Sequence, residues 1–110
     1  MAKGLLIASF NFANVAEDEF NDWYDNVHVP DALKTPGFIS GRRFVNPDIS
    51  TIEAGKYLAI YEIETDDIRK TMAAMLQNLR ELEKQGRLSK LLDVVSVTVY
   101  KQITPEIKAK

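Results

Sequence analysis

The chain of 110 residues contains no cysteine. Without thiols it has no disulfide framework, no thiolate nucleophile and none of the commonest structural zinc sites. It also lacks a long hydrophobic run. The apolar stretch in MAKGLLIASF is too short to span a membrane, alternates like a β-strand, and is not followed by a small-residue cleavage site. We therefore expect a cytoplasmic protein.

An excess of charge of one sign is lacking as well. The chain has 14 basic and 16 acidic side chains, which give a formal net charge of −2. Binding to nucleic acid or to an anionic membrane usually needs a basic surface, so we predict neither kind of partner. The length and the hydrophobic content of 45% suit one compact domain spanning residues 1–110.

Four segments alternate apolar and polar or small residues with the period of a β-strand: residues 3–12, 38–46, 56–64 and 91–103. Two segments with helical spacing follow the first and the third of them. Pro30 predicts that the first helix ends or kinks near Val27 to Val29. Thr65 is a candidate cap for the second helix, and Pro36 with Gly37 suits a type II turn before the second strand.

The resulting order is β-α-β-β-α-β. With right-handed crossovers it predicts an α+β, ferredoxin-like plait, in which a four-stranded antiparallel sheet carries both helices on one face. The first and fourth strands have apolar residues on both sides, so the other face of the sheet also needs a cover. We expect that cover to be a second copy of the sheet, in a symmetric homodimer with sheet-to-sheet packing.

The segment FNDWYDNVHVP holds the only tryptophan and the only histidine of the chain. On a helical wheel the apolar residues of this segment form one sector, and His28 lies at its edge, one turn after Tyr24. We expect a mostly apolar cavity between this helix end and the sheet, as is typical of small-molecule pockets. Its predicted lining from the helix is Trp23, Tyr24 and His28.

An imidazole takes up and returns protons near neutral pH, which makes His28 a candidate general acid or base. Asp25 could orient it, and Tyr24 or Tyr61 could donate a hydrogen bond to a developing oxyanion. A purely structural alternative is open: His28 could cap carbonyl groups at the helix end, with Trp23 and Tyr24 as ordinary core residues.

The run EFNDWYDNVHVPDALKTPGFISGRRF combines an acidic helix start, a WYD triplet, an H-x-P helix end, a PGF turn and a strand with two arginines. It resembles the EthD-like branch of the dimeric α/β-barrel superfamily, over residues 11–44. The resemblance implies a ferredoxin-like homodimer whose two sheets form a barrel, with a ligand cavity in each subunit. The histidine of that family falls on His28, and its Trp-Tyr-Asp triplet on Trp23, Tyr24 and Asp25.

Three further side chains are candidate substrate-binding groups. Asn11 could bind a ligand or cap the following loop. Arg42 and Arg43 point to opposite faces of their strand; Arg43 could bind a substrate carboxylate or form a surface ion pair. Tyr61 faces either the helices or the dimer partner, and the sequence does not decide between them.

These observations predict a cofactor-independent enzyme of small-molecule catabolism, of the lyase or isomerase type. It would isomerise, cyclise or dehydrate a small apolar oxygenated molecule such as an aromatic, a polyketide or a lactone, without a metal ion. One alternative is a non-catalytic binding or accessory protein that uses the same cavity. Another is a cofactor-free or haem-using monooxygenase, in which His28 would be the only available axial histidine.

Overall fold

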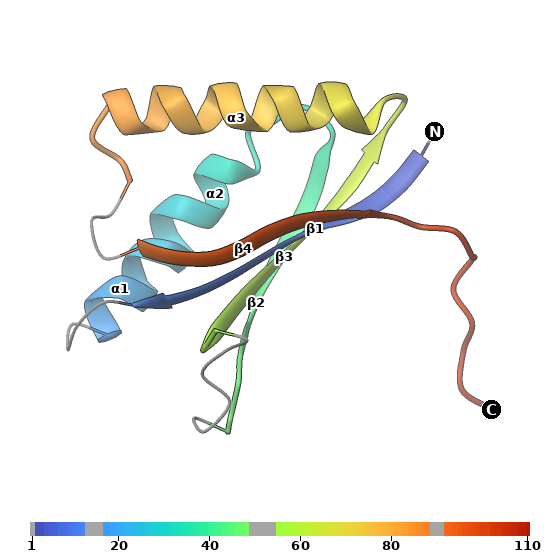
Figure 1. The fold of residues 1–110 in the computed structure, drawn as a ribbon, viewed down its shortest axis with the longest axis horizontal. Coiled ribbons are helices and arrows are strands. Elements are labelled where there is room, and N and C mark those ends of the chain that lie inside the picture. The colour runs from blue at the N-terminus through green and yellow to red at the C-terminus, as the bar shows by residue number, and fades with distance from the viewer. Residues whose placement is uncertain (1, 13–16, 49–54, 89–91) are drawn as a thin grey trace.

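The computed structural model describes residues 2–12, 17–48, 55–88 and 92–110. Helical segments follow the first and the third strand along the chain, and they lie on one side of the strands (Figure 1). In chain order the elements are β1 (Ala2–Phe12), α1 (Glu17–Trp23), η1 (Tyr24–His28), α2 (Val29–Ala32), β2 (Phe38–Val45), β3 (Tyr57–Thr65), α3 (Ile68–Lys84) and β4 (Leu92–Lys101).

The strands form one antiparallel sheet in the order β2-β3-β1-β4. Leu6, near the middle of β1, pairs with Tyr61 of β3 on one side and with Val99 of β4 on the other. The first and third strands are therefore neighbours at the centre of the sheet. This arrangement confirms the predicted α+β, ferredoxin-like plait.

One face of the sheet packs against the helices. Residues of this face and of the helices share a single buried cluster that contains Leu6, Phe10, Phe20, Tyr24, Ala32, Tyr57, Ala59, Tyr61, Ile63 and Met75. Alternation along each strand places the intervening residues, such as Leu5 of β1 and Ile60 of β3, on the opposite face. Both faces of the sheet thus carry apolar side chains, and the helices cover only one of them.

The first helical segment does not end before Pro30. It passes through η1, a π-helical turn in which the Val29 N–H donates to the carbonyl of Tyr24, five residues earlier, and continues as α2. In a regular α-helix the proline ring would clash with the carbonyl four residues before it. The wider π turn relieves this clash, and Pro30 then lies in the first turn of α2, where its missing N–H is not needed.

The second helix is capped by Asp67, and the expectation that Thr65 caps it was wrong. The Asp67 side chain accepts hydrogen bonds from the backbone N–H groups of Arg69 at 3.0 Å and Lys70 at 3.3 Å. Thr65 is the last residue of β3, and its hydroxyl meets that of Thr71 at 2.8 Å. A cap needs extended backbone immediately before the first helical residue, and Asp67 has it.

The type II turn expected at Pro36 and Gly37 is present. The N–H of Phe38 donates to the carbonyl of Thr35 at 3.1 Å, and Gly37 has φ +93°, which the third position of this turn requires. Within the described part of the chain, no helix is both long and apolar enough to cross a membrane.

Candidate functional site

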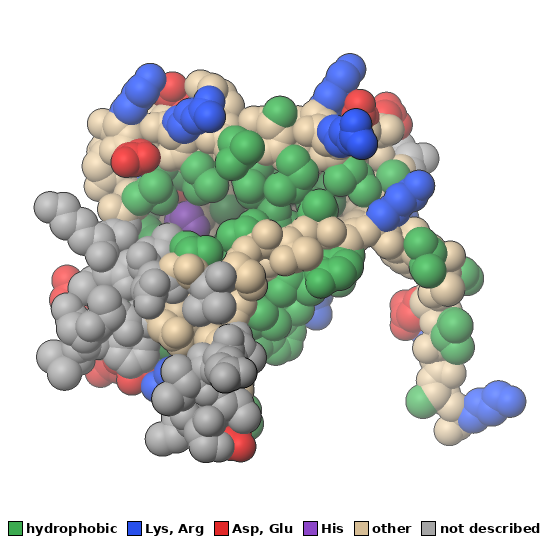
Figure 2. Space-filling model, in the orientation of Figure 1, with side chains coloured by type: hydrophobic (Ala, Val, Ile, Leu, Met, Phe, Trp, Pro, Cys, Tyr) green, Lys and Arg blue, Asp and Glu red, His purple; other side chains and the backbone are tan. Residues whose placement is uncertain are grey.

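A cavity of about 430 Å³ lies between the sheet and the helices. Its wall includes Leu6, Ala8 and Phe10 from β1, Tyr61 from β3, and Met75 and Leu79 from α3. Figure 2 shows hydrophobic side chains gathered along the hollow between α3 and β4, with the histidine at one end of this band. The cavity is therefore mostly apolar, as the sequence predicted.

The polar residues of the wall are Asn78, Arg80 and Glu83 from α3, Tyr24 and His28 from η1, and Tyr61 from β3. Tyr24, His28 and Tyr61 are the ones that the sequence predicted. All three are buried, with exposed fractions of 2%, 7% and 3%. Neither Nδ1 of His28 nor the hydroxyl of Tyr61 makes a hydrogen bond of ordinary geometry within the described residues. The Tyr61 hydroxyl nevertheless lies close enough to that of Tyr24 for each to influence the pKa of the other. Buried polar atoms without partners are rare in folded proteins, so these two atoms are the natural contacts for a ligand.

Aromatic rings hold the imidazole in place. His28 is stacked on Trp23, with ring centres 4.9 Å apart, and meets the ring of Tyr24 edge to face at 4.8 Å. The indole N–H of Trp23 donates to the carbonyl of Arg87 at 3.0 Å, in the segment that follows α3. Trp23 is not part of the cavity wall and supports His28 from behind.

Burial sets the protonation states of the site. It lowers the pKa of His28 to about 4, with the charge of Arg43 acting in the same direction and the carboxylate of Asp31 acting against it. Burial also raises the pKa of Tyr24 and of Tyr61 above that of a free phenol. At neutral pH the site therefore presents a neutral imidazole and two protonated hydroxyl groups.

Asp25 does not orient His28 in the way that the sequence suggested. Its side chain is 58% exposed and accepts a hydrogen bond from Nη1 of Arg43 at 2.8 Å. Asp25 and His28 are three positions apart along η1, but His28 is buried in the core while Asp25 is exposed at the surface. Asp25 thus acts on the site through Arg43.

Arg43 lies beside the site and is not in the cavity wall. Its guanidinium donates to Asp25 and, at 2.9 Å, to the side-chain oxygen of Asn21. The carbon Cζ of Arg43 is 4.4 Å from the ring centre of Tyr24, within the range of a cation–π contact. From β2, Arg43 therefore braces Tyr24 and brings a positive charge close to the cavity.

Asn11 also lies outside the wall. Its side-chain oxygen accepts a hydrogen bond from the backbone N–H of Lys56 at 2.8 Å, which fixes the start of β3 against the end of β1. Among the seven site residues that the sequence suggested, Tyr24, His28 and Tyr61 share the cavity wall. Trp23, Asp25 and Arg43 surround that group, and Asn11 does not contact it.

Asp31 and Arg87 form a pair outside the cavity wall that the sequence did not indicate. The carboxylate of Asp31, 3% exposed, accepts hydrogen bonds from Nε of Arg87 at 2.6 Å and from Nη2 at 3.2 Å. This pair, together with the bond from Trp23, fastens the segment after α3 to the first helical segment. The adjoining Leu88 forms part of the wall. The separation of 56 residues left no local signal for the pair.

Comparison with known proteins gives no match to a family profile and no match in sequence to a curated protein. Solved structures do match. HapK from Hahella chejuensis superposes with a TM-score of 0.63 at 14% identity, covering 97% of this chain and 99% of its own. An EthD family protein from Bacillus halodurans gives 0.58 at 15% identity, with coverage of 94% and 100%.

The chain has the ferredoxin-like fold of these proteins. MupZ from Pseudomonas fluorescens has it as well, with a TM-score of 0.60 at 19% identity over 90% of this chain and 68% of its own. The resemblance suggested by the sequence is thus confirmed at the level of the fold. Within the described residues of this ferredoxin-like chain, no group of three or more His, Asp or Glu side chains is placed to hold a metal ion.

Proposed function

We propose that the chain is a cofactor-independent enzyme of small-molecule metabolism that moves a proton on a small, largely apolar, oxygenated substrate. One observation carries this proposal. The buried His28 Nδ1 has no hydrogen-bond partner among the described residues, and the buried Tyr61 hydroxyl has only that of Tyr24 near it. Both residues line a mostly apolar cavity of about 430 Å³. Such a cavity binds an apolar body and directs its few polar groups.

His28 has the role of general base. Because its pKa is lowered to about 4, the imidazole is unprotonated at neutral pH and free to accept a proton. In the proposed step, a C–H bond next to a carbonyl group of the substrate breaks and the proton goes to an imidazole nitrogen. The electron pair moves to the carbonyl oxygen, which becomes an enolate.

Tyr61 stabilises this oxygen. Its raised pKa keeps the phenol protonated, so it donates a hydrogen bond to the enolate without losing its proton. Tyr24 is the second possible donor, and the charge of Arg43 behind it favours negative charge nearby. An imidazolium is costly in this buried site, but the enolate formed with it supplies the opposite charge.

The fate of the enolate sets the type of reaction. Return of the proton from His28 to a different carbon gives an isomerisation. Loss of a hydroxyl group from the neighbouring carbon, with the proton from His28, gives an alkene and water. Attack of the enolate carbon on a second carbonyl group of the substrate forms a C–C bond and closes a ring, while the attacked carbonyl oxygen takes the electron pair of its π bond and the proton from His28. All three products begin from the same proton transfer, which is therefore the step to test.

The test is exchange of substrate hydrogen for deuterium. The protein is incubated in D₂O with a panel of ketones, lactones and phenolic polyketide fragments, and the mass of each compound is then measured by mass spectrometry. We expect deuterium uptake or conversion of at least one class. His28→Gln should reduce the rate about 10²- to 10⁴-fold, and Tyr61→Phe about 10²- to 10³-fold.

Tyr57→Phe is the matched control. Tyr57 lies on the same face of β3 as Tyr61, but its hydroxyl is hydrogen-bonded to Glu17 and Asn21, and it is not in the cavity wall. Loss of the Tyr57 hydroxyl should leave the rate of deuterium exchange within about twofold of that of the wild type, since this hydroxyl is not in contact with the substrate in the proposed mechanism.

Binding without turnover is the alternative outcome. A compound that raises the melting temperature but gains no deuterium and does not change in mass would identify a binding protein that uses the same cavity. Equal rates for the wild type and His28→Gln would remove the histidine from the mechanism.

A further inference from the structure

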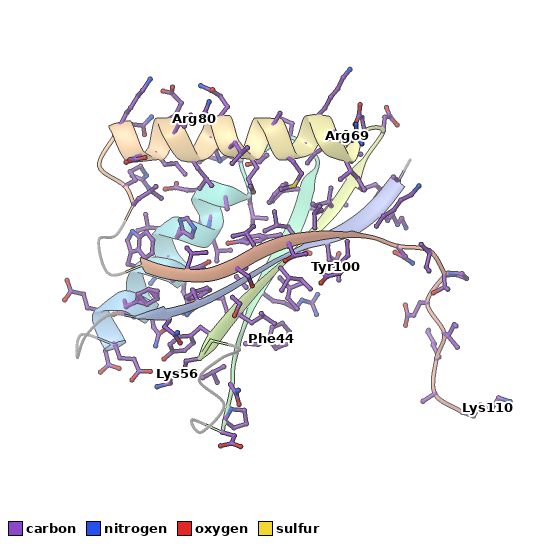
Figure 3. All side chains as sticks on the ribbon, viewed as in Figure 1. Phe44, Lys56, Arg69, Arg80, Tyr100 and Lys110 are labelled. Carbon is purple, nitrogen blue, oxygen red and sulfur yellow. The ribbon has the colours of Figure 1, made fainter. Side chains whose placement is uncertain are left out.

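The face of the sheet opposite to the helices is uncovered and apolar. Leu5 of β1 and Ile60 of β3 lie on it, and so do Phe44 and Tyr100, which are 46% and 56% exposed. Figure 3 shows Phe44 and Tyr100 on the side of the strands away from α3. Large apolar side chains gathered on one exposed face usually mark an interaction surface.

The last nine residues form a tail that runs away from this sheet (Figure 1). Its root is anchored, because the N–H of Gln102 donates to the carbonyl of Lys3 at 2.8 Å. Beyond the root every residue is exposed, and Ile103 and Ile107 are exposed to 92% and 82%. Two isoleucines in water on a projecting segment have no packing role within their own chain.

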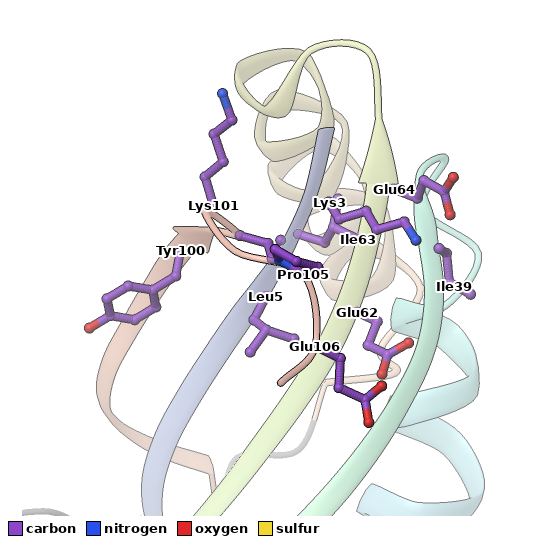
Figure 4. A pocket seen from close by; sticks show the side chains of 12 residues that line it. Lys3, Leu5, Ile39, Glu62, Ile63, Glu64, Tyr100, Lys101, Pro105 and Glu106 are labelled. Carbon is purple, nitrogen blue, oxygen red and sulfur yellow. The ribbon is translucent and has the colours of Figure 1, made fainter. Parts of the chain in front are cut away.

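A groove of about 710 Å³ lies where the tail leaves the sheet. Figure 4 shows its lining, with Leu5 and Ile39 as apolar floor and edge and Glu62 and Glu64 along one side. Glu62 meets Arg42 at 3.7 Å. Glu64 lies opposite Lys3 across the β1–β3 pair, and Lys3 and Lys101 line the same groove. The groove thus has an apolar surface bordered by side chains of both charges.

We propose that the tail, residues 102–110, lies in this groove of a second copy of the same chain, and that the two copies exchange tails. A twofold dimer needs one surface that carries both complementary parts, and this face carries the groove and the tail together. The apolar parts match, Ile103 and Ile107 against Leu5 and Ile39. The tail and the groove both carry charges of each sign, with Glu106 and Lys108 in the tail and Glu64 and Lys3 in the groove.

The exchange also explains why the occupant is another copy and not the chain's own tail. Pro105 and Glu106 already form one wall of the groove, yet Ile103 and Ile107 on either side of them remain in solvent. The tail therefore borders its own groove without filling it. In the dimer, the tails cover the edges of the two apolar sheet faces as these pack together.

The first experiment measures the dissociation constant of the dimer by analytical ultracentrifugation. We expect the wild type to be a dimer, and Ile103→Asp and Ile107→Asp each to weaken it roughly tenfold or more, as loss of a buried isoleucine requires. Thr104→Asp is the control, because Thr104 is also exposed and has no large apolar side chain to bury. Deletion of residues 103–110 should weaken the dimer further.

The second experiment places the tail. The chain has no cysteine, so Ile107→Cys and Ile39→Cys each introduce a unique thiol. When the two variants are mixed and oxidised, we expect a disulfide between two different chains. A double variant that instead forms the bond within one chain, a wild type that is monomeric at micromolar concentration, or a dimer unaffected by deletion of the tail would overturn the proposal. None of these changes touches the cavity, so the result is independent of the proposed enzyme activity.

Discussion

The imidazole of His28 lies against the indole of Trp23, with ring centres 4.9 Å apart and planes inclined by 21°. These are the only histidine and the only tryptophan of the chain. The indole closes one face of the imidazole to water, and the edge contact with Tyr24 closes more of its surface. Contact with Trp23 therefore helps to keep the imidazole of His28 neutral. Because histidine and tryptophan each occur once in the chain, each gives its own spectroscopic signal.

The protonation of His28 can be followed directly by NMR, because a single histidine gives a single set of imidazole signals. We expect its pKa in the folded protein to be about 4, against about 6.5 for an unperturbed histidine. Arg43→Met should raise this pKa by removing a nearby positive charge, and Asp31→Asn should lower it further. A value at or above 6.5 would show that the ring is open to solvent.

The free energy of unfolding should depend on pH through the same group. The pKa of His28 is lower in the folded state, so the unfolded chain takes up this proton first as the pH falls. The contribution to stability is complete above about pH 6.5 and is lost as the pH falls towards 4. At 1.36 kcal/mol per unit, the loss is about 3 kcal/mol.

The contribution of His28 to the free energy of unfolding is measured by urea unfolding of the wild type and of His28→Gln at a series of pH values, as the difference between the two proteins. Glutamine does not titrate, so the variant should lose less stability than the wild type over that interval, and the two curves should converge as the pH falls. Parallel curves would mean that His28 does not carry the predicted shift. The comparison cancels the carboxylates that titrate in both proteins.

Asp31 meets two cations of different exposure, which allows a matched test of its role. Arg87→Met removes both hydrogen bonds to a carboxylate that is 3% exposed, and should lower the free energy of unfolding by about 2–3 kcal/mol. The Lys34 side chain is 71% exposed, and its Nζ lies 3.5 Å from Oδ1 of Asp31. Lys34→Met removes this ion pair and should lower the free energy of unfolding by less than about 1 kcal/mol. Equal losses in thermal or urea unfolding would contradict the assignment of Arg87 as the main partner.

Gly41 lets the ring of Tyr61 lie against β2. A Cβ atom at this position would be 2.9 Å from Cδ1 of Tyr61 and 3.2 Å from Cγ1 of Val29, both too close. Gly41→Ala should therefore push the ring towards the cavity, cost about 1–3 kcal/mol of stability, and reduce ligand binding. Ser40→Ala is the neighbouring control. The buried Ser40 hydroxyl has no partner among the described residues, so its removal should be neutral or slightly stabilising.

Prediction from the sequence worked where a local pattern carries the information. Alternation along β1 correctly separated Leu6 and Phe10 from Leu5 and Ile7, because the side chains of a strand point to opposite faces wherever the strand lies. The break expected at Pro30 was only partly right. A proline forbids a regular helix, but the sequence does not show that a π turn can carry the chain past it.

The candidate site was predicted in part for the same reason. Tyr24 and His28 are four residues apart, so helical spacing already placed them together. The sequence did not show whether Tyr61 faces the helices or the opposite side of the sheet, since both faces of β3 are apolar. Only the assembled sheet places Tyr61 on the helix side, in the cavity wall. The partners of Asp25 and Asp31 are arginines 18 and 56 residues away, and no local spacing indicates such pairs.

By itself, then, the sequence determined the order of strands and helices and the ferredoxin-like fold, because hydrophobic periodicity and chain connectivity are local properties that allow few topologies. Only the tertiary structure decided the chemistry of the site. A pKa depends on how much water surrounds a group and on which charges approach it. For His28 the water is excluded by Trp23 and Tyr24. The charges that shift its pKa are those of Asp31 and Arg43, and Arg43 comes near it only when the sheet and helices pack together.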